Sequence, residues 1–378
     1  MRRTWEEINR KIDDGSVVVV TAEEMTELTA EAGPEEAFRR VDVVTTGTFG
    51  PMCGSGLLLN TGHHRPRLNY REASLNDVPA YAGLAAVDLY LGATARSASA
   101  PRYGGGHVVE DLVSGRAVTL RARGHGTDCY PGLAVEKGLR LADLGNAVLL
   151  NPRNCYQNYN VAVNASSPRT VHTYMGPLLP GMANVAYSSA GVLSPLLNDP
   201  EYRTLGIGSR VFLGGGTGYV AFPGTQHSPD GPRSPEGVPL EGAGTLGLAG
   251  DLRGMSPGYL RGAWIQGYGV SLAVGVGTAI PLLDMDLAVQ TGLPESSLTA
   301  PVVDYASAYP EKSGEVVGRA SYAELRSGAV RLGGSERRTM PLSSFFKARE
   351  IAVELKRRIA RGDFRPCRPV EPLPGSAG

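Results

Sequence analysis

The sequence lacks several features that would identify a zinc-binding, redox, nucleic-acid-binding or membrane protein. Its 378 residues include only four cysteines, and no two of them form a CxxC pair, which argues against a structural zinc knuckle or a thioredoxin-type motif. Basic and acidic residues are equal in number, 37 of each, so the net charge gives no reason to expect nucleic acid or an anionic membrane as a partner. The apolar stretches are interrupted by Gly, Asp or Arg well before the roughly 20 residues that a membrane-spanning helix needs.

Further absences narrow the kind of site that can be expected. The six histidines include no HExxH motif, and the adjacent His63 and His64 would seldom both bind one ion, so we predict no metal site. The stretch GIGSRVFLGGGTG (206–218) lacks the GK[ST] of a phosphate-binding loop. Charged residues run through the first fourteen positions, unlike a signal peptide, so we expect a cytoplasmic protein whose cysteines are free thiols.

What the sequence has instead is glycine, 50 residues in all, dense between about positions 50 and 310 among short strand-like segments. Such density indicates tight turns and places where backbones approach closely. Before this region, Thr4 and Glu7 show the capping-box pattern of a short helix, and Thr21 caps a helix over residues 22–32. After it, residues 345–362 have the pattern of a long amphipathic helix.

We therefore predict a mixed α/β fold, with a glycine-rich core of short strands, flanking N-terminal helices and a long C-terminal amphipathic helix. One catalytic domain is expected over residues 1–363, followed by an extended tail over 364–378. The loop rich in proline and glycine at 227–242 is the best internal candidate for a lid or an insertion.

Cys53 is the first candidate for a reactive thiol. It lies in TTGTFGPMCGSG, directly after a predicted strand, with Gly50, Gly54 and Gly56 around it. Glycines leave backbone N–H groups free to face a ligand, and such groups stabilise a thiolate or an oxyanion. The alternative is a small buried apolar residue in a tight turn, and the local sequence does not separate the two.

Cys129 is the second candidate, and its neighbours favour a functional role. It lies in RARGHGTDCYPG, where Arg121, Arg123 and His125 contribute positive charge. Positive charge lowers the pKa of a thiol because the thiolate is the form that it stabilises. Asp128 would have the opposite effect if it faced the sulfur, so His125 or an arginine must be the closer neighbour.

The amide-rich segment NPRNCYQNYNVAVN (151–164) suits a polar substrate. Its alternation predicts that residues 155–160 form a strand. Amide side chains can fix the carboxylate and amino groups of a substrate, and a guanidinium can hold a carboxylate through two hydrogen bonds. The alternative is an edge strand with a hydrogen-bonded polar face. The residues assigned here to substrate binding are Arg153, Asn154, Gln157 and Asn158.

Two histidines are candidates for acid–base chemistry. His107 lies in YGGGHVVEDL, and His125 is close to Cys129 in the chain. Each can equally be a structural histidine with satisfied hydrogen bonds. Cys367, in the proline-rich tail, is assigned no role.

Long motifs over nearly the whole chain, about residues 5–373, resemble one family. The motifs are VDVVTTGTFGPMCGSG, LNDVPAYAGLAAVD, YGGGHVVEDLVSG, GHGTDCYP, NPRNCYQNYNVAVN, TYMGPLLP, YSSAGVLSPLLNDPEYRTLGIGSRVFLGGGTGYVAFPGTQH and MPLSSFFKAREIAVELKRRI. Together they resemble the homocysteine-biosynthesis, sulfur-incorporation family, whose characterised activity is that of an L-aspartate semialdehyde sulfurtransferase. Within these motifs, Tyr174 and Arg210 are also assigned to the substrate.

The resemblance implies conversion of a small aldehyde into a thiol by cysteine persulfide chemistry. The family's two cysteines match Cys53 and Cys129 through their surrounding motifs. No tightly bound cofactor is implied. The expected co-reactants are sulfide or a persulfide sulfur donor and an external electron donor, often a small ferredoxin-type or other reductant protein. The nucleotide-sensing domains that some members carry are not expected in this chain, and a homo-oligomer stays open.

We hypothesise the following sequence of chemical steps. A persulfide on Cys129 adds its terminal sulfur to the carbonyl, and His125, His107 or water protonates the oxygen. Cys53 then attacks the sulfur–sulfur bond and leaves a Cys53–Cys129 disulfide for the partner to reduce. The disulfide requires the two Cα atoms to approach within about 7 Å.

Two alternatives remain. The same chemistry can act on another small acidic aldehyde, such as sulfoacetaldehyde or a specialised-metabolite precursor, because nothing in the sequence fixes the substrate. The protein can also be a persulfide carrier without carbonyl chemistry. An exposed Cys129 on a flat surface would favour the carrier, and a polar pocket beside it would favour the enzyme.

Overall fold

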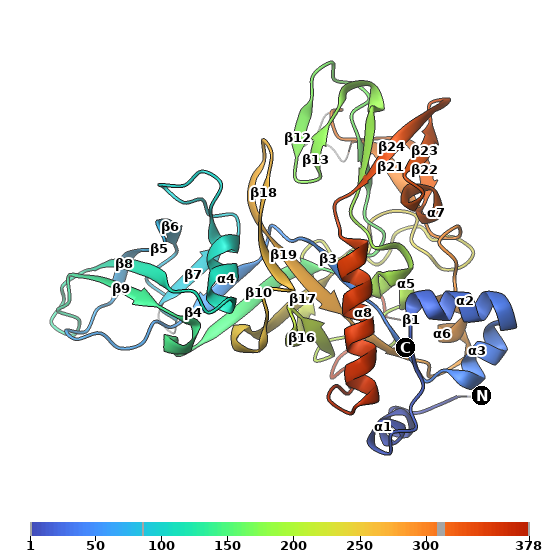
Figure 1. Cartoon of the computed structure of the whole chain (residues 1–378), viewed down its shortest axis with the longest axis horizontal. Coiled ribbons are helices and arrows are strands. Elements are labelled where there is room, and N and C mark those ends of the chain that lie inside the picture. Colours follow the sequence, from blue (N-terminus) through green and yellow to red (C-terminus); the bar gives the residue numbers. More distant parts are fainter. Residues whose placement is uncertain (1, 85–86, 308–313, 377–378) are drawn as a thin grey trace.

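The computed structural model describes residues 2–84, 87–307 and 314–376, and it has the mixed α/β fold that the sequence predicts (Figure 1). Helices and short strands alternate at the N-terminus, strands dominate the middle, and a long helix lies near the C-terminus. The α-helices are α1 (Trp5–Asp13), α2 (Ala22–Ala32), α3 (Pro34–Arg40), α4 (Gly105–Val113), α5 (Pro195–Asn198), α6 (Met285–Thr291), α7 (Tyr322–Arg326) and α8 (Phe345–Ala360).

A capping box marks the start of each of the first two helices. The Glu7 N–H donates to the Thr4 side chain while the Glu7 carboxylate accepts from the Thr4 N–H, and Thr21 and Glu24 repeat this exchange at the start of α2. Both starts are confirmed as predicted, because a capping box depends only on residues three positions apart. Between the two helices, β1 (Val19–Thr21) joins a three-stranded sheet with β2 (Val43–Thr45) and β20 (Ala279–Pro281).

A nine-stranded sheet forms the centre of the molecule. Its strands follow the order β18-β19-β15-β16-β17-β10-β4-β7, all antiparallel, and β3 also pairs with β19. Every residue of β19 is buried, as expected of a strand covered on both faces. The strands are β3 (Thr48–Pro51), β4 (Gly56–Leu59), β7 (Leu89–Gly92), β10 (Ala147–Asn154), β15 (Arg210–Leu213), β16 (Gly216–Pro223), β17 (Leu246–Asp251), β18 (Leu260–Ile265) and β19 (Gly269–Gly277).

Three smaller sheets complete the fold. A four-stranded sheet in the order β6-β5-β8-β9 lies at one end of the molecule, and a mixed six-stranded sheet and a two-stranded hairpin lie toward the other (Figure 1). The first contains β5 (Tyr70–Leu75), β6 (Val78–Ala80), β8 (Val118–Gly124) and β9 (Ala134–Leu139). The second contains β11 (Val161–Val163), β14 (Asn184–Tyr187), β21 (Thr299–Asp304), β22 (Glu315–Ser321), β23 (Ala329–Leu332) and β24 (Ser335–Pro341). The hairpin is β12 (Val171–Thr173) and β13 (Gly176–Leu178).

The long C-terminal helix lies against the central sheet. Its apolar face is buried on β3 and β19 through Ala348, Ile351, Ala352, Leu355 and Ile359. Full burial of each large aliphatic side chain contributes roughly 1.5–3 kcal/mol. The close approach depends on Gly47, because a Cβ at this position would lie 2.1 Å from the carbonyl oxygen of Ala348.

The strand predicted for residues 155–160 is wrong. The β10 strand ends at Asn154, and Cys155 and Asn158 have φ angles of 51° and 56°, which a strand does not contain. The alternation of polar residues here instead reflects an irregular segment whose side chains make hydrogen bonds in several directions.

Two segments expected to be loose are attached to the body of the protein. In the loop at 227–242, the Arg233 guanidinium donates to the carbonyl of Gly237 at 2.9 Å, and Val238 is buried. In the tail, Glu371 forms a β-bridge with Ile207, and Leu373 is buried. Across the described residues, no helix is long and apolar enough to span a membrane.

Candidate functional site

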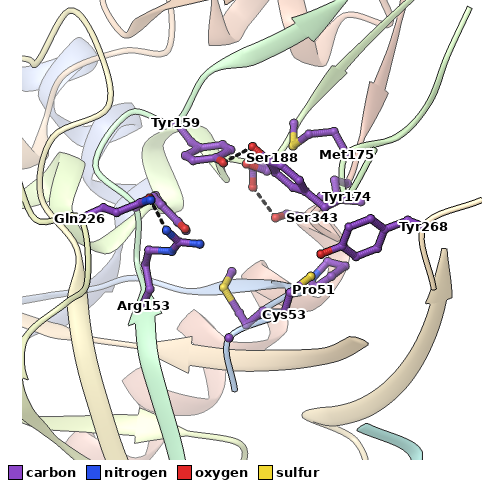
Figure 2. A pocket seen from close by; sticks show the side chains of 14 residues that line it. Pro51, Cys53, Arg153, Tyr159, Tyr174, Met175, Ser188, Gln226, Tyr268 and Ser343 are labelled. Carbon is purple, nitrogen blue, oxygen red and sulfur yellow. Dashed lines mark hydrogen bonds between the residues drawn. The ribbon is translucent and has the colours of Figure 1, made fainter. Parts of the chain in front are cut away.

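A pocket lies where the central sheet meets the β12–β13 hairpin and the segment leading into α8 (Figure 2). It encloses about 180 Å³. This volume suits a small metabolite, because drug-sized ligands occupy roughly 300–1,000 Å³. The lining residues are Pro51, Met52, Cys53, Gly54, Arg153, Tyr156, Tyr159, Tyr174, Met175, Ser188, Gln226, Tyr268, Leu342 and Ser343.

Cys53 is the thiol that lines this pocket. It lies in the loop from β3 to β4, is half-buried and is a free thiol. Its Sγ accepts a hydrogen bond from the Ser271 hydroxyl at 3.3 Å, and Ser271 is fully buried on β19. The Met52 N–H donates to the Leu272 carbonyl at 2.8 Å, which attaches the loop to the same strand. A rigid strand therefore positions the sulfur.

Arg153 brings positive charge to the pocket from the end of β10. Its guanidinium donates to Gln226 Oε1 and lies 5.4 Å from the centroid of the Tyr156 ring. Among the described residues that line the pocket, none is an aspartate or a glutamate. The charge is therefore available for an anion, and a guanidinium matches a carboxylate best because it can form two parallel hydrogen bonds.

Four tyrosines form much of the pocket wall. The ring centroids are 4.3 Å apart for Tyr156 and Tyr159, 6.4 Å for Tyr159 and Tyr174, and 6.3 Å for Tyr174 and Tyr268. Burial is the main cause that raises the pKa of Tyr156 to about 12, with Arg153 acting in the opposite direction. Burial also raises the pKa of Tyr159 and Tyr174. The phenols of Tyr156, Tyr159 and Tyr174 therefore keep their protons at neutral pH.

Hydrogen bonds connect the tyrosine wall. The Tyr174 hydroxyl shares one hydrogen bond with the Tyr159 hydroxyl and another with the Tyr305 hydroxyl, the latter at 3.1 Å. The hairpin that carries Tyr174 contacts the β18–β19 turn, where His172 Nδ1 lies 3.2 Å from the Gln266 carbonyl oxygen. The hairpin and the turn thus form one continuous side of the pocket.

Three buried polar side chains close to the pocket in sequence have unpartnered atoms in the described structure. These atoms are the Ser55 hydroxyl, both amide atoms of Asn151 and the Asn154 Nδ2. Asn154 Oδ1 accepts from the Cys155 N–H at 2.6 Å, so the orientation of that amide is fixed. A buried polar group left without a partner would cost about 1–3 kcal/mol, so water or a bound molecule that formed hydrogen bonds with these atoms would be stabilised there.

Cys129 lies outside this pocket, in the loop between β8 and β9. Cys129 and His125 are both exposed near the tip of the loop, and neither lines the pocket of Cys53. The Gly132 N–H donates to the Arg67 carbonyl at 2.8 Å, which holds the base of the loop. The structure therefore does not bring Cys129 and Cys53 into the same site.

The positive charge beside Cys129 is partly compensated. Arg121 forms ion pairs with Asp77 and Glu136, the latter at 3.3 Å. Arg123 is exposed and Asp128 is exposed. Because these side chains are exposed, water screens their charges.

His107 is the third residue of α4, and its side chain caps the start of the helix. Its Nδ1 accepts from the Gly104 N–H at 3.2 Å, and its ring stacks on Tyr103 with 5.3 Å between centroids. Burial lowers the pKa of His107, while Glu110 and Asp111 act in the opposite direction. It does not line the pocket of Cys53.

The side-chain amide of Gln157 forms all its hydrogen bonds within the protein. Its Nε2 donates to the carbonyls of Leu196 and Pro200 at 2.8 and 2.9 Å. Its Oε1 accepts from the Tyr202 hydroxyl and, at 3.2 Å, from the Gly244 N–H. No hydrogen-bonding capacity is left for a substrate.

Asn158 and Arg210 also lie outside the pocket. Asn158 donates to the Thr299 carbonyl at 2.6 Å and accepts from the Tyr322 hydroxyl at 3.0 Å. Arg210, on β15, donates to the Arg365 carbonyl at 3.2 Å. Of the residues assigned to the substrate from the sequence, the structure brings Arg153 and Tyr174 together with Cys53.

Sequence reasoning missed most of the pocket wall. Gln226, Tyr268 and Ser343 come from three separate turns, and a single sequence carries no signal that links them. Tyr156 and Tyr159 had a local signal, because they interrupt the amide-rich segment beside Arg153. No group of three His, Cys, Asp or Glu side chains that could hold a metal ion occurs in the part of the chain described.

Comparisons with known proteins place this geometry in context. The model of the family described as homocysteine biosynthesis enzyme, sulfur-incorporation, matches residues 17–365. The chain is 49% identical over 374 residues to the L-aspartate semialdehyde sulfurtransferase of Methanosarcina acetivorans, covering 99% of this chain and 72% of that protein. It is 43% identical over 378 residues to the protein of the same name from Methanocaldococcus jannaschii, covering 96% and 71%. No solved structure matches the chain significantly.

Proposed function

This chain belongs to the homocysteine biosynthesis enzyme, sulfur-incorporation family, and on that premise we propose that it converts a small acidic aldehyde into the corresponding thiol. The family makes it a sulfur-incorporating enzyme, a sulfurtransferase. The name of its relatives makes L-aspartate semialdehyde the first substrate to test, with L-homocysteine as the product.

One observation carries the proposal, namely that Cys53 and Arg153 line the same small pocket. Figure 2 shows Arg153 and Gln226 on one side of it, Tyr268 on the opposite side, and Cys53 between them at the base. A carboxylate bound to Arg153 would fix one end of a four-carbon acid. The aldehyde at the other end could then be directed toward the sulfur.

The two cysteines have different roles in the proposed sequence. The terminal sulfur of a Cys129 persulfide adds to the carbonyl carbon and forms a carbon–sulfur bond. The Cys53 thiolate then attacks the sulfur of Cys129, the sulfur–sulfur bond breaks, and a carbinol thiolate leaves. A Cys53–Cys129 disulfide remains. This step requires the β8–β9 loop to move Cys129 to within disulfide reach of Cys53.

The proposed reaction needs electrons from an external donor. The carbinol thiol loses water to give a thioaldehyde, and two electrons with two protons reduce the thioaldehyde to the thiol. Two further electrons reduce the disulfide. When free sulfide is the sulfur source, no disulfide forms, because its sulfur is already fully reduced. The two electrons that reduce the thioaldehyde then suffice. A ferredoxin-type or other reductant protein is the proposed source, and no tightly bound cofactor is required.

Neutral tyrosines are the proposed proton donors to the carbonyl oxygen. Tyr159 and Tyr174 keep their protons because burial raises their pKa, and both residues line the pocket. They take the role that the sequence assigned to His107, which lies elsewhere. His125 could contribute only when its loop approaches the pocket.

The test is product formation from sodium sulfide, an aldehyde and a chemical reductant, followed by mass spectrometry of the thiol. A persulfide donor replaces sulfide in a parallel series. In the persulfide series we expect Cys53→Ser and Cys129→Ser each to lower the rate more than a hundredfold, because both sulfurs take part in the exchange. With free sulfide no sulfur–sulfur bond has to break, so neither substitution should lower the rate to that extent. Cys367→Ser is the matched control and should retain full activity.

Three outcomes would contradict the proposal. With the persulfide donor, full activity of Cys129→Ser removes the persulfide step, and full activity of Cys53→Ser removes the attack by the pocket thiol. Absence of thiol product from every aldehyde removes the reaction itself. Sulfoacetaldehyde is included because another small acidic aldehyde would satisfy Arg153 equally well.

A further inference from the structure

The amino group of an amino-acid aldehyde has no acidic partner among the described residues of the pocket. The amides of Gln157 and Asn158, which the sequence suggested for this purpose, are used within the protein. We propose that Tyr159, Tyr174 and Tyr268 form an aromatic cage for a primary ammonium group. This inference rests on the proposed function and adds to it the binding site for the amino group of the substrate.

The rings are arranged as such a cage requires. Tyr174 is central, with its ring centroid 6.4 Å from that of Tyr159 and 6.3 Å from that of Tyr268, at interplanar angles of 59° and 68°. Rings inclined at these angles are not stacked on one another, so a cation could contact the faces of two of them at once. Tyr174 comes from the hairpin and Tyr268 from the β18–β19 turn, and Figure 2 shows the two side chains next to each other on one side of the pocket.

The electrostatics favour a cation on these rings. Burial keeps the phenols of Tyr159 and Tyr174 neutral, so the rings act through their π faces and hydroxyl oxygens rather than as phenolates. A cation within about 6 Å of a ring centroid is attracted, and more strongly when water is excluded. The pocket already contains one such pair, since Arg153 lies 5.4 Å from the centroid of Tyr156.

The cage and the guanidinium complement each other. A second cation beside Arg153 would be repelled on its own, but the carboxylate of an amino acid lies between the two charges. An α-amino acid carries both groups on one carbon, and Tyr159 adjoins Tyr156, over which Arg153 lies, with 4.3 Å between the Tyr156 and Tyr159 centroids. The pocket therefore selects a zwitterion over a simple carboxylate.

Equilibrium binding tests the cage without turnover. L-Homoserine and 4-hydroxybutyrate have the same four-carbon skeleton and differ only in the amino group, and neither bears the reactive aldehyde. By titration calorimetry of the whole protein, we expect homoserine to bind at least about tenfold more tightly. Tyr174→Leu should abolish that preference, while Tyr174→Phe, which keeps the ring, should retain most of it. Tyr219→Leu, on the exposed face of β16, is the matched control.

The outcomes separate the cage from the function. Equal binding of the two ligands by the wild-type protein overturns the cage while thiol formation from an aldehyde leaves the enzymatic proposal standing. Loss of the preference in Tyr174→Phe as well as Tyr174→Leu overturns the ring contribution in favour of the hydroxyl. Binding of neither ligand overturns both the cage and the carboxylate site at Arg153. Tyr268→Leu provides a second variant if Tyr174→Leu does not fold.

Discussion

The surroundings of Cys53 and Cys129 differ in burial, in charge and in the number of segments that contribute to them. Cys53 lies in a small pocket built from turns of several sheets, with a buried serine donating to its sulfur. Cys129 is exposed near the tip of one loop between two neighbouring strands. The first environment can select a small molecule. The second is accessible to a bulky donor, such as another protein.

The difference suggests a division of labour between collection and chemistry. A sulfur atom received at an exposed thiol needs few precise contacts, because the donor brings its own. Carbonyl chemistry needs fixed donors and exclusion of water, which a pocket provides. The predictions below test whether the two environments differ in this way.

Thiol accessibility should show the largest effect. Under native conditions we expect iodoacetamide to modify Cys129 more than a hundredfold faster than Cys155, with Cys53 between them. Cys155 is buried, and burial raises the pKa of its thiol, so little thiolate forms. Peptide mapping by mass spectrometry gives the three rates in one experiment.

The same reaction in denaturant is the control, because all four cysteines should then react at similar rates. Homoserine should protect Cys53 and leave Cys129 unchanged. A native protein in which Cys53 reacts fastest would reverse the comparison.

Substrate affinity should depend on the pocket of Cys53. Arg153→Gln should raise KM for an acidic aldehyde by about 10-fold to 100-fold with a smaller change in kcat, because a hydrogen-bonded charge contributes about 1.5–3 kcal/mol. Arg153→Lys should recover part of the loss. Arg39→Gln, at an exposed position of α3, is the control. An unchanged KM in Arg153→Gln would show that the carboxylate binds elsewhere.

The hydrogen bond from Ser271 should have a moderate effect. Ser271→Ala removes the donor to Cys53 Sγ, and we expect alkylation of Cys53 to slow about fivefold, the equivalent of roughly 1 kcal/mol. The rate at Cys129 in the same sample is an internal reference. Equal slowing of both cysteines would indicate a general change in the protein rather than a local one.

His107 should have the smallest effect on activity. His107→Gln keeps a side-chain acceptor for the Gly104 N–H, and we expect kcat to change less than about twofold. Since burial lowers the pKa of His107, its contribution to stability is complete above the unfolded value of about 6.5. That contribution is lost as the pH falls from there through the folded pKa.

Thermal melts between pH 7 and pH 5 check the sign. The Tm of His107→Gln should decrease less over this range than that of the wild-type protein, although His64, whose pKa burial also lowers, keeps part of the dependence. A hundredfold loss of kcat with unchanged Tm would return His107 to the catalytic machinery.

Local chemistry explains which parts of the fold could be predicted. The capping boxes at Thr4 and Thr21 and the helix over 345–360 were predictable, because the determining residues are within a few positions of one another. The pairing of β3 with β19 was not, because more than 200 residues separate these strands. The left-handed backbone at Cys155 was hidden by an alternating pattern that is typical of strands.

In the candidate site, too, the residues with a local sequence signal could be predicted and those placed by long-range contacts could not. Two residues could be identified from their neighbours in the sequence. Cys53 is surrounded by glycines, and Arg153 is the cation of an amide-rich segment. The structure places both in one pocket. Gln157 and Asn158 had the right chemistry for a substrate, but long-range contacts with other loops use their amides. Tyr268 carried no local signal, since only the fold brings its turn to the pocket.

The contribution of Ser343 to the pocket has a consequence for the newly made protein. Its hydroxyl donates to the Ser188 carbonyl, and the next residue binds back to β3 through the Ser344 N–H and the Phe49 carbonyl, 2.9 Å apart. The wall beside Cys53 therefore cannot close until the ribosome has added roughly 290 more residues, which takes on the order of 15–60 s at 5–20 residues per second. During that interval the Cys53 thiol is open to cellular oxidants and metals, and a chaperone or a cellular reductant would have to protect it.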